Sequence, residues 1–225
     1  MNTEKPRERT FPRTEVFAEI DRLGLNANVL ELESEGYTVV PSVLDVDTIA
    51  RAQDAILYQL ERKTGSRPDL KTYDGPALPL AHFLLFEDEV FEQILMNEVM
   101  LALMVYLLGQ SLTISSMTSH VKASANGHLP LHSDTPGMTP FRSESIVANC
   151  NFALDDYTKE NGCLAIIPST HRLGRNPTGE ENNPHTNPFV VPVEVPIGSA
   201  IIYHGNTWHG AFKREAPGVR LNLAV

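Results

Sequence analysis

A histidine and an aspartate separated by one residue, His132 and Asp134, lie just past the middle of the chain. If this stretch is a β-strand, residues i and i+2 point to the same face, so the imidazole and the carboxylate converge on one point. Such a pair suits a metal ion, a proton relay or a hydrogen-bonded surface pair. His-x-Asp alone is weak evidence for a metal site, so the rest of the sequence must supply a third ligand.

Two histidines further along the chain, His204 and His209, are candidates for that third ligand. Two histidines and one carboxylate, with the other positions left to water and substrate, form the facial triad of non-haem iron(II) oxygenases. Arg220 follows His209 by eleven residues, across a turn that contains Pro217 and Gly218. An antiparallel return would bring its guanidinium beside the metal, ready to bind a carboxylate through two hydrogen bonds. From the residues alone, both His204 and His209 remain candidates for the third ligand.

The order of these residues resembles the phytanoyl-CoA dioxygenase family, and two further stretches are similar to it. They are EGYTVVPSVLDVDTIARAQ at 35–53 and FALDDYTKENGCLAIIPSTHRLG at 152–174. The resemblance extends over most of the chain from about residue 35 onward. It implies an iron(II)- and 2-oxoglutarate-dependent oxygenase with a double-stranded β-helix, or jelly-roll, core.

The resemblance also implies roles for individual residues. The family's metal ligands fall on His132, Asp134 and His209, and its 2-oxoglutarate arginine falls on Arg220. The expected cofactors are therefore iron(II), 2-oxoglutarate and O2, and the expected reaction oxidises an unactivated C–H bond with release of succinate and CO2. Related halogenases carry a small residue in place of the carboxylate, so Asp134 favours oxygenation over halogenation.

Two further positions of the family contact the co-substrate, and they fall on His120 and Asn151. The family often has a serine two residues after the distal histidine, whereas this chain has Ala211. That change removes one expected hydrogen bond to the co-substrate and leaves the arginine in place. The remaining histidines are interpreted as scaffold or surface-loop residues: His82, His128, His171 and His185.

Two other functions use the same three ligands. A cupin-like isomerase or hydrolase would hold zinc or manganese there, but it has no clear need for Arg220. A non-catalytic binding protein for small molecules would keep the scaffold, although an intact triad weighs against it. The substrate itself is not specified by the sequence. No cluster of basic residues marks a site for the phosphates of coenzyme A, which favours a small natural product or an amino-acid-like molecule.

The elements that must position these residues are predicted from helical periodicity before Gly109 and from short β-prone segments after it. Before Gly109, helices are predicted at 15–23, at 26–34, from 45 or 47 to about 63, and at 91–108, with a short β-rich run at 36–41. After it, β-prone segments are predicted at 112–123, 145–154, 162–167, 189–195, 200–203 and 219–225. Many short strands with regular turns indicate an antiparallel sandwich or barrel. The predicted fold is mainly β, with a jelly-roll, cupin-like core at about 110–225 and flanking helices in the N-terminal part, about 1–109.

The composition suits one folded domain over 1–225, since 42% of the residues are hydrophobic and 20% are charged. A net charge of −10 without a basic block disfavours nucleic acid and anionic membranes as partners. The two cysteines have no CxxC spacing, and the charged N-terminus lacks the apolar core of a signal peptide, so a cytoplasmic protein is predicted. We expect a monomer or homodimer that acts on a small molecule and does not span a membrane.

Overall fold

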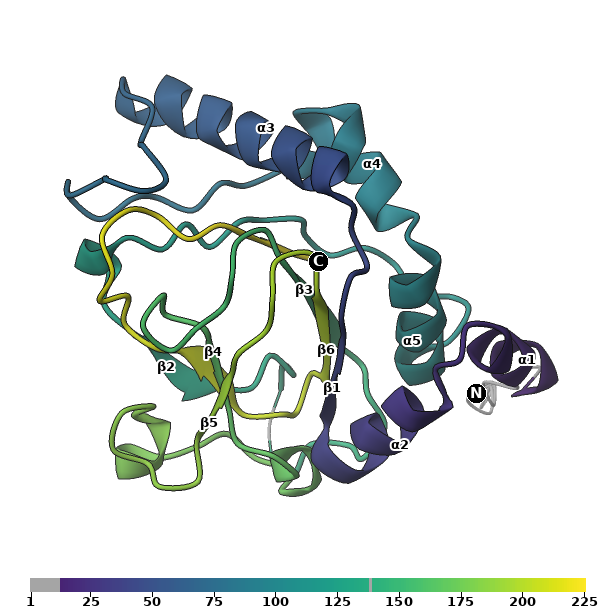
Figure 1. The fold of residues 1–225 in the computed structure, drawn as a ribbon. Helices are drawn as coiled ribbons and strands as arrows, with labels where there is room; N and C mark the ends of the chain where they lie inside the picture. The colour runs from purple at the N-terminus through teal and green to yellow at the C-terminus, as the bar shows by residue number, and fades with distance from the viewer. Residues whose placement is uncertain (1–12, 138) are drawn as a thin grey trace, which may run out of the picture.

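Two four-stranded antiparallel sheets face each other in the computed structural model, which describes residues 13–137 and 139–225 (Figure 1). The first sheet has the order β1 (Tyr37–Val40), β6 (Ala200–His204), β3 (Ala148–Ala153) and β8 (Asn222–Ala224). The second has the order β2 (Leu129–His132), β7 (His209–Ala211), β4 (Leu164–Ile166) and β5 (Val191–Val193). The chain passes repeatedly between the two sheets, which is the jelly-roll arrangement, and the predicted fold class is confirmed. Residues 1–12, which include the charged N-terminus considered above, lie outside the described residues.

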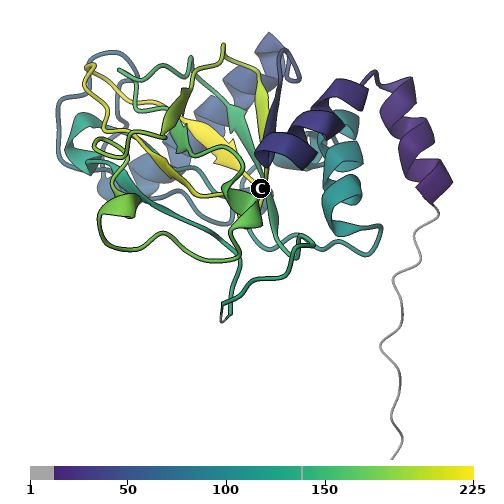
Figure 2. The same ribbon diagram turned by 90° about the horizontal axis from the view of Figure 1, so that it is seen from below.

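Helices cover the outer face of the first sheet, as Figures 1 and 2 show from two directions. They are α1 (Arg13–Arg22), α2 (Asn26–Glu35), α3 (Val46–Thr64), α4 (Glu89–Leu95) and α5 (Glu98–Leu108). Helix α5 packs directly on β3 and β6, whereas α1 packs on α5. Strand alternation divides the core accordingly. In β3, Cys150 and Phe152 are fully buried against the helical layer, and Ile202 of β6 joins them. Ile201 and Tyr203 of β6 point the other way, into the core between the sheets. The inner face of the first sheet therefore points towards the second sheet, where its side chains can line a site.

The predicted helix at 91–108 is divided into α4 and α5, which meet at an angle of 55°. The break has a local cause: the Asn97 side chain accepts a hydrogen bond of 3.1 Å from the backbone N–H of Met100, which is the bond of a helix N-cap. The sequence prediction treated Asn97 as an interior residue because the apolar periodicity continues across it. Among the described helices, none is long and apolar enough by itself to cross a membrane, whereas α4 and α5 together reach that length and composition.

The predicted strand at 112–123 is not a regular strand. This segment runs alongside the C-terminal residues and forms isolated bridges, Thr118 with Ala224 and Lys122 with Arg220. Strand β2 was not predicted, because Pro130 interrupts a short sequence that otherwise has little β-character. Both differences matter for the site, since β2 ends at His132 and the bridged segment carries His120.

Candidate active site

His132 and His209 face each other across two neighbouring strands. In the antiparallel pair β2–β7 they are direct cross-strand partners, and their ring centroids lie 4.4 Å apart. Gly210 makes this pairing possible, because a Cβ there would lie less than 3.0 Å from the carbonyl oxygen of Leu129. The glycine of the sequence Trp-His-Gly thus lets the two backbones approach closely.

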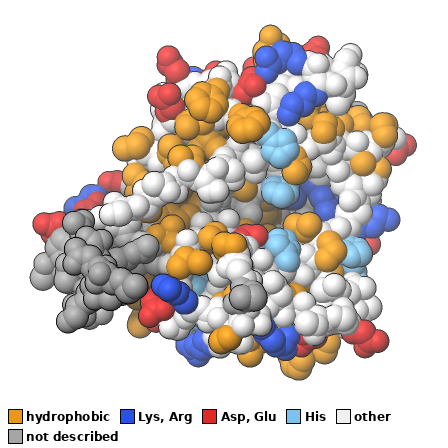
Figure 3. Space-filling model, turned by 180° about the vertical axis from the view of Figure 1, so that it is seen from behind, with side chains coloured by type: hydrophobic (Ala, Val, Ile, Leu, Met, Phe, Trp, Pro, Cys, Tyr) orange, Lys and Arg blue, Asp and Glu red, His pale blue; other side chains and the backbone are white. Residues whose placement is uncertain are grey.

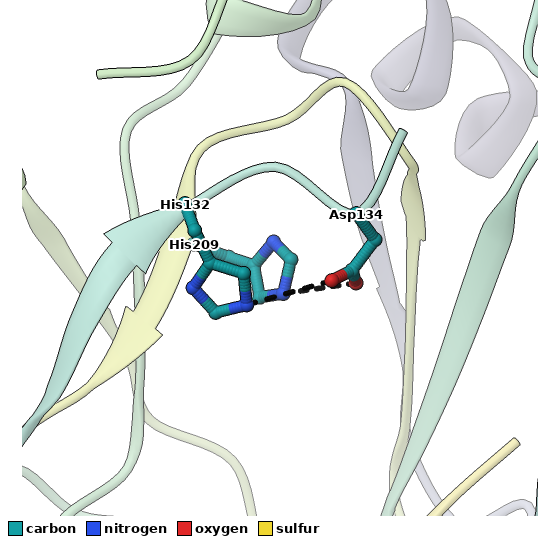
Figure 4. Close-up of side chains that lie close together, drawn as sticks. All are labelled: His132, Asp134 and His209. Carbon is teal, nitrogen blue, oxygen red and sulfur yellow. Dashed lines mark ion pairs between the residues drawn. The ribbon is translucent and has the colours of Figure 1, made fainter. Parts of the chain in front are cut away.

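Asp134 completes the cluster from a loop (Figure 4). Its Oδ1 lies 3.4 Å from His132 Nε2, and its Oδ2 lies 3.2 Å from His209 Nε2. The sequence analysis explained the convergence of His132 and Asp134 by strand alternation, and this explanation was wrong, because β2 ends at His132. Asp134 is instead turned inward by its backbone N–H, which donates a 2.9 Å hydrogen bond to the carbonyl of Gly205. The Asn149 amide, from β3, donates a 2.9 Å hydrogen bond to Asp134 Oδ2 and fixes the carboxylate.

Both imidazoles present the same nitrogen to this point. His132 Nδ1 donates to the carbonyl of Pro130 at 2.9 Å, and His209 Nδ1 donates to the carbonyl of Thr207 at 3.0 Å. The proton of each neutral ring is therefore on Nδ1, and each Nε2 keeps a lone pair for a metal. One ligand atom from each of the three residues lies within 4.8 Å of the others. The donor set of two nitrogens and one carboxylate fits iron(II).

The charges of the cluster are strongly coupled. Burial alone would raise the pKa of Asp134, but its contacts with the Nε2 atoms of His132 and His209 hold the pKa far below the usual range. In the metal-free protein such a contact is a hydrogen bond only when Nε2 carries a proton as well as Nδ1. For His132, burial lowers the pKa, while the bonds to Asp134 and Pro130 outweigh burial and raise it. The Asp134 carboxylate therefore stays ionised at any ordinary pH, and the ionised form is the one that binds a cation.

A cavity of about 740 Å³ opens beside the three residues. Figure 3 shows the corresponding hollow from behind, with histidine side chains gathered along it and hydrophobic side chains beside it. Arg220 lines this cavity and is 3% exposed; its guanidinium lies 4.3 Å above the ring of Tyr157, and its Nε has no hydrogen-bond partner. Among the described residues, no carboxylate forms an ion pair with it. A buried guanidinium without an anion fits the distal carboxylate of 2-oxoglutarate.

The structure also brings His120 and Asn151 to the cavity wall. Asn151 is buried, accepts a hydrogen bond from the Asn222 amide, and lies 3.5 Å from the hydroxyl of Tyr203. His120 lines the cavity but is solvent-exposed, and the partial desolvation of its ring, followed by the charge of Arg220, lowers its pKa. His120 is therefore neutral near pH 7 and adds no charge to the wall.

His204 lies apart from this cluster. Its Nδ1 accepts a 3.0 Å hydrogen bond from the N–H of Asn206, and its Nε2 lies 3.2 Å from the carbonyl of Ser143. The choice of His209 over His204 thus agrees with the geometry of the three clustered residues. His128 and His185, interpreted from the sequence as ordinary surface residues, lie with ring centroids 5.2 Å apart, and His128 lines the cavity.

Two residues at the site were given no role in the sequence analysis. Asn149 binds the carboxylate of Asp134, and its position two residues before Asn151 on one strand was the signal that could have found it. Lys122 lines the cavity beside Arg220. The sequence signal for Lys122 was its position two residues after His120, which places both side chains on the same side of an extended segment. The pairing of this segment with Arg220 is not visible in the sequence.

Comparisons with known proteins agree with this arrangement. The ectoine dioxygenase of Stutzerimonas stutzeri is 23% identical over 238 aligned residues, which cover 92% of this chain and 78% of that protein. The dioxygenase trt7 of Aspergillus terreus is 24% identical, with 86% of this chain and 70% of that protein covered.

Solved structures share the fold. HygX from Streptomyces hygroscopicus, with nickel and 2-oxoglutarate bound, has a TM-score of 0.69 at 16% identity, covering 88% of this chain and 84% of that one. The epimerase SnoN, in complex with Fe3+, alpha ketoglutarate and nogalamycin RO, has a TM-score of 0.66 at 22% identity, covering 91% and 83%.

The family model described as phytanoyl-CoA dioxygenase (PhyH) matches residues 32–221. This range contains both sheets almost entirely, all three clustered residues and the buried arginine. The chain therefore belongs to the phytanoyl-CoA dioxygenase family and is an iron- and 2-oxoglutarate-dependent oxygenase.

Proposed function

We propose that His132, Asp134 and His209 hold the iron(II) and that Arg220 binds the distal carboxylate of 2-oxoglutarate. The observation that carries this proposal is the opening of the His-Asp-His cluster into a cavity that also contains a buried guanidinium, which forms no ion pair with a carboxylate of the described residues. A non-redox metalloenzyme would use the three ligands but has no evident use for this cation. The family membership supports the same reading.

The residues of the chain orient and shield the reacting groups. The two Nδ1–H bonds to backbone carbonyls fix the rings of His132 and His209, and Asn149 fixes the carboxylate of Asp134. When bound, iron(II) and 2-oxoglutarate supply the oxidising chemistry, in which O2 is consumed, the keto acid becomes succinate and CO2, and the substrate is oxidised. Asn151 and the neutral ring of His120 complete the wall on which the co-substrate lies.

The substrate we propose is a small organic molecule with an apolar part. Away from the metal cluster, the cavity is lined by Leu80, Leu101, Met104, Leu108 and Ile114. Such a wall excludes water and binds hydrocarbon, while polar groups at the other end set the orientation. The net charge of −10 also supports a free small molecule over nucleic acid as the partner.

Anaerobic titration with iron(II) and 2-oxoglutarate tests the proposal. A chelated keto acid on iron(II) gives a weak visible charge-transfer band, and we expect the wild-type protein to show it. His132→Ala, Asp134→Ala and His209→Ala should each abolish the band while the protein remains folded by circular dichroism.

His204→Ala is the matched control, because it removes an imidazole that lies outside the cluster. This variant should keep the band. Loss of the band in His204→Ala together with retention in His209→Ala would contradict the proposed ligands. Succinate release, screened over small organic molecules and followed by mass spectrometry for a gain of one oxygen atom, then identifies the substrate.

A further inference from the structure

Ser133, the residue between His132 and Asp134, is held by a side chain from a distant loop. The Oδ1 atom of Asn176 accepts two hydrogen bonds from Ser133, one from its backbone N–H at 3.0 Å and one from its hydroxyl at 2.7 Å. Asn176 lies 43 residues further along the chain, in a loop that belongs to neither sheet. The same loop contains a short 3₁₀ helix, Gly179–Asn182, that contacts β2.

The segment that Asn176 holds is the least enclosed part of the metal cluster. The side chains of His132 and Asp134 are 39% and 32% exposed, whereas the side chain of His209 is 5% exposed. Strand β2 ends at His132, so Ser133 and Asp134 lie outside the strand ladder. The backbone N–H of Asp134 is bonded to Gly205, and Ser133 is bonded to Asn176. Each of these two contacts therefore restrains the position of Asp134 relative to His132.

The residue before Asn176 fixes the same loop against the third member of the cluster. The guanidinium of Arg175 lies 4.7 Å from the ring centroid of Trp208, and the carbonyl of Arg175 accepts a 2.7 Å hydrogen bond from the indole Nε1. Trp208 directly precedes His209. Two consecutive loop residues thus contact the chain neighbours of all three clustered residues.

The loop is also braced internally. The guanidinium of Arg175 donates hydrogen bonds of 2.7 and 2.8 Å to the two carboxylate oxygens of Glu181, a bidentate pair with a defined orientation. These bonds lower the pKa of Glu181 to about 2, so the pair stays charged at neutral pH. Glu181 also accepts a 2.9 Å hydrogen bond from the backbone N–H of Thr178. The carbonyl and ring contacts of Arg175 and the amide of Asn176 are therefore presented from one braced segment.

We propose that Asn176 is a positioning residue for the metal centre, and that its two hydrogen bonds to Ser133 set the separation between His132 Nε2 and the Asp134 carboxylate. This inference rests on the proposed function, in which His132 and Asp134 bind iron(II). Asn176 does not touch the metal and acts only through Ser133. Ligands that are held in place before the metal binds lose less conformational freedom on binding, so the affinity is higher.

Titration with cobalt(II), followed by visible absorption, tests this role without turnover. Asn176→Ala should weaken cobalt(II) binding about tenfold, at the lower end of the range for groups that orient metal ligands. The d–d bands of bound cobalt(II) should also change in intensity, because they depend on the geometry of the ligands. Asn176 is exposed, so we expect the variant to fold and to show the circular dichroism spectrum of wild type.

Asn176→Asp provides the rescue, because it keeps an oxygen that can accept both bonds from Ser133. This variant should restore the cobalt(II) affinity and also the wild-type band intensities, which an added negative charge by itself would not restore. A spectrum of Asn176→Asp that matched the spectrum of Asn176→Ala would overturn the proposed role.

Asn183→Ala is the matched control. Asn183 lies in the same loop, and its Oδ1 accepts a 2.9 Å hydrogen bond from the backbone N–H of His185, away from the metal ligands. This variant should keep both the affinity and the spectrum of wild type. Equal losses in Asn183→Ala and Asn176→Ala would assign the effect to general loop stability and overturn the role of Asn176.

The inference and the function can fail separately. If the wild-type protein does not bind cobalt(II), or if His132→Ala binds it equally well, the proposed metal site itself is contradicted. If wild type binds through His132 and Asn176→Ala binds with the same affinity and spectrum, the function stands and the role of Asn176 is overturned.

Discussion

Arg220 is a buried guanidinium whose side chain forms no ion pair with a carboxylate of the described residues, and this determines the effect of replacing it. Removing one partner of a buried charge pair costs about 2–5 kcal/mol, so Arg220→Ala should weaken 2-oxoglutarate roughly 30- to several-thousandfold. Arg220→Lys should recover only part of this, because an ammonium lacks the two-pronged geometry. Calorimetry with 2-oxoglutarate measures the loss, and metal binding alone should be unchanged. Equal affinities in wild type and Arg220→Ala would remove the main support for the co-substrate site.

Lys122 gives a pH-dependent prediction for the ligand-free protein. Its pKa is about 8 in the folded state against 10.5 as the reference value, so the unfolded chain holds the proton more tightly. The ammonium therefore destabilises the fold below pH 8, and this cost disappears as the pH rises from 8 towards 10.5. At pH 7, Lys122→Met should be more stable than wild type by roughly 3 kcal/mol.

Urea denaturation of both proteins from pH 7 to pH 10 measures this difference. Subtracting the variant from wild type cancels the tyrosines and cysteines that titrate in the same range. We expect the difference between the two free energies of unfolding to shrink above pH 8. A constant difference would show that the buried Lys122 ammonium does not destabilise the fold.

At the scale of the elements, the approach of β2 to β7 at Gly210 is the contact that pairs the two histidines. A methyl group in Gly210→Ala would meet backbone atoms of Leu129 and Pro130, which cannot rotate away. The strands must then separate by several tenths of an ångström or more, and His132 moves away from His209. We expect metal affinity to fall more than tenfold, measured by titration with iron(II) under anaerobic conditions.

Gly65→Ala is the control for this change. Gly65 ends α3 with a positive φ of 78° and has open space around its Cα, so the substitution costs backbone strain of about 1 kcal/mol and touches no ligand. A loss of stability with unchanged metal affinity is expected. If Gly65→Ala and Gly210→Ala lowered metal affinity equally, the effect would be one of global stability.

Strand β3 carries two kinds of residue on its two faces. Phe152 is fully buried under the helices, so Phe152→Ala should cost about 3–5 kcal/mol of stability and leave 2-oxoglutarate binding intact. Asn151 faces the cavity but is bonded to Asn222, so Asn151→Ala should lose co-substrate affinity and also about 1–3 kcal/mol of stability, since a buried amide is left unpaired. Thermal melts and calorimetry on both variants check the two faces. A normal melt for Phe152→Ala would show that the assigned faces are reversed.

The elements also show what sequence patterns specify. The periodicity of α3 and its cap at Asp45 were readable, because both depend on neighbours within one or two turns. The position of Asp134 depends on the carbonyl of Gly205, some seventy residues away, so the strand argument brought His132 and Asp134 together through a local structure that the chain does not have. Lys122 was passed over for the same reason: nothing near it in the sequence indicates that Arg220 lies opposite.

For the whole molecule, the site lies between the two sheets and takes residues from both. His132 and His209 belong to the second sheet, whereas Asn149 and Asn151 belong to the first. A metal and 2-oxoglutarate bound together should therefore stabilise the entire fold. At a ligand concentration of 100 times the Kd the gain is about 2.7 kcal/mol, or roughly 5–10 °C in Tm for a protein of this size.

Thermal melts with nickel(II), with 2-oxoglutarate and with both measure this linkage. The joint effect should exceed the sum of the separate ones and should vanish in His132→Ala. A shift of the same size in that variant would indicate binding elsewhere on the surface.

The bonds from His132 and His209 to backbone carbonyls have a consequence for mutational tolerance. Each ring is oriented by the carbonyl of the residue two positions before it, Pro130 and Thr207, and every amino acid has that carbonyl. Side chains at 130 and 207 are therefore free to change over evolution without altering which ring nitrogen carries the proton. The Thr207 hydroxyl donates to the carbonyl of Gly36, so a change there costs stability and spares the imidazole. Selection on Thr207 should therefore act through stability and selection on Pro130 through backbone conformation, and a survey of tolerated substitutions should find position 130 far more permissive than Gly210.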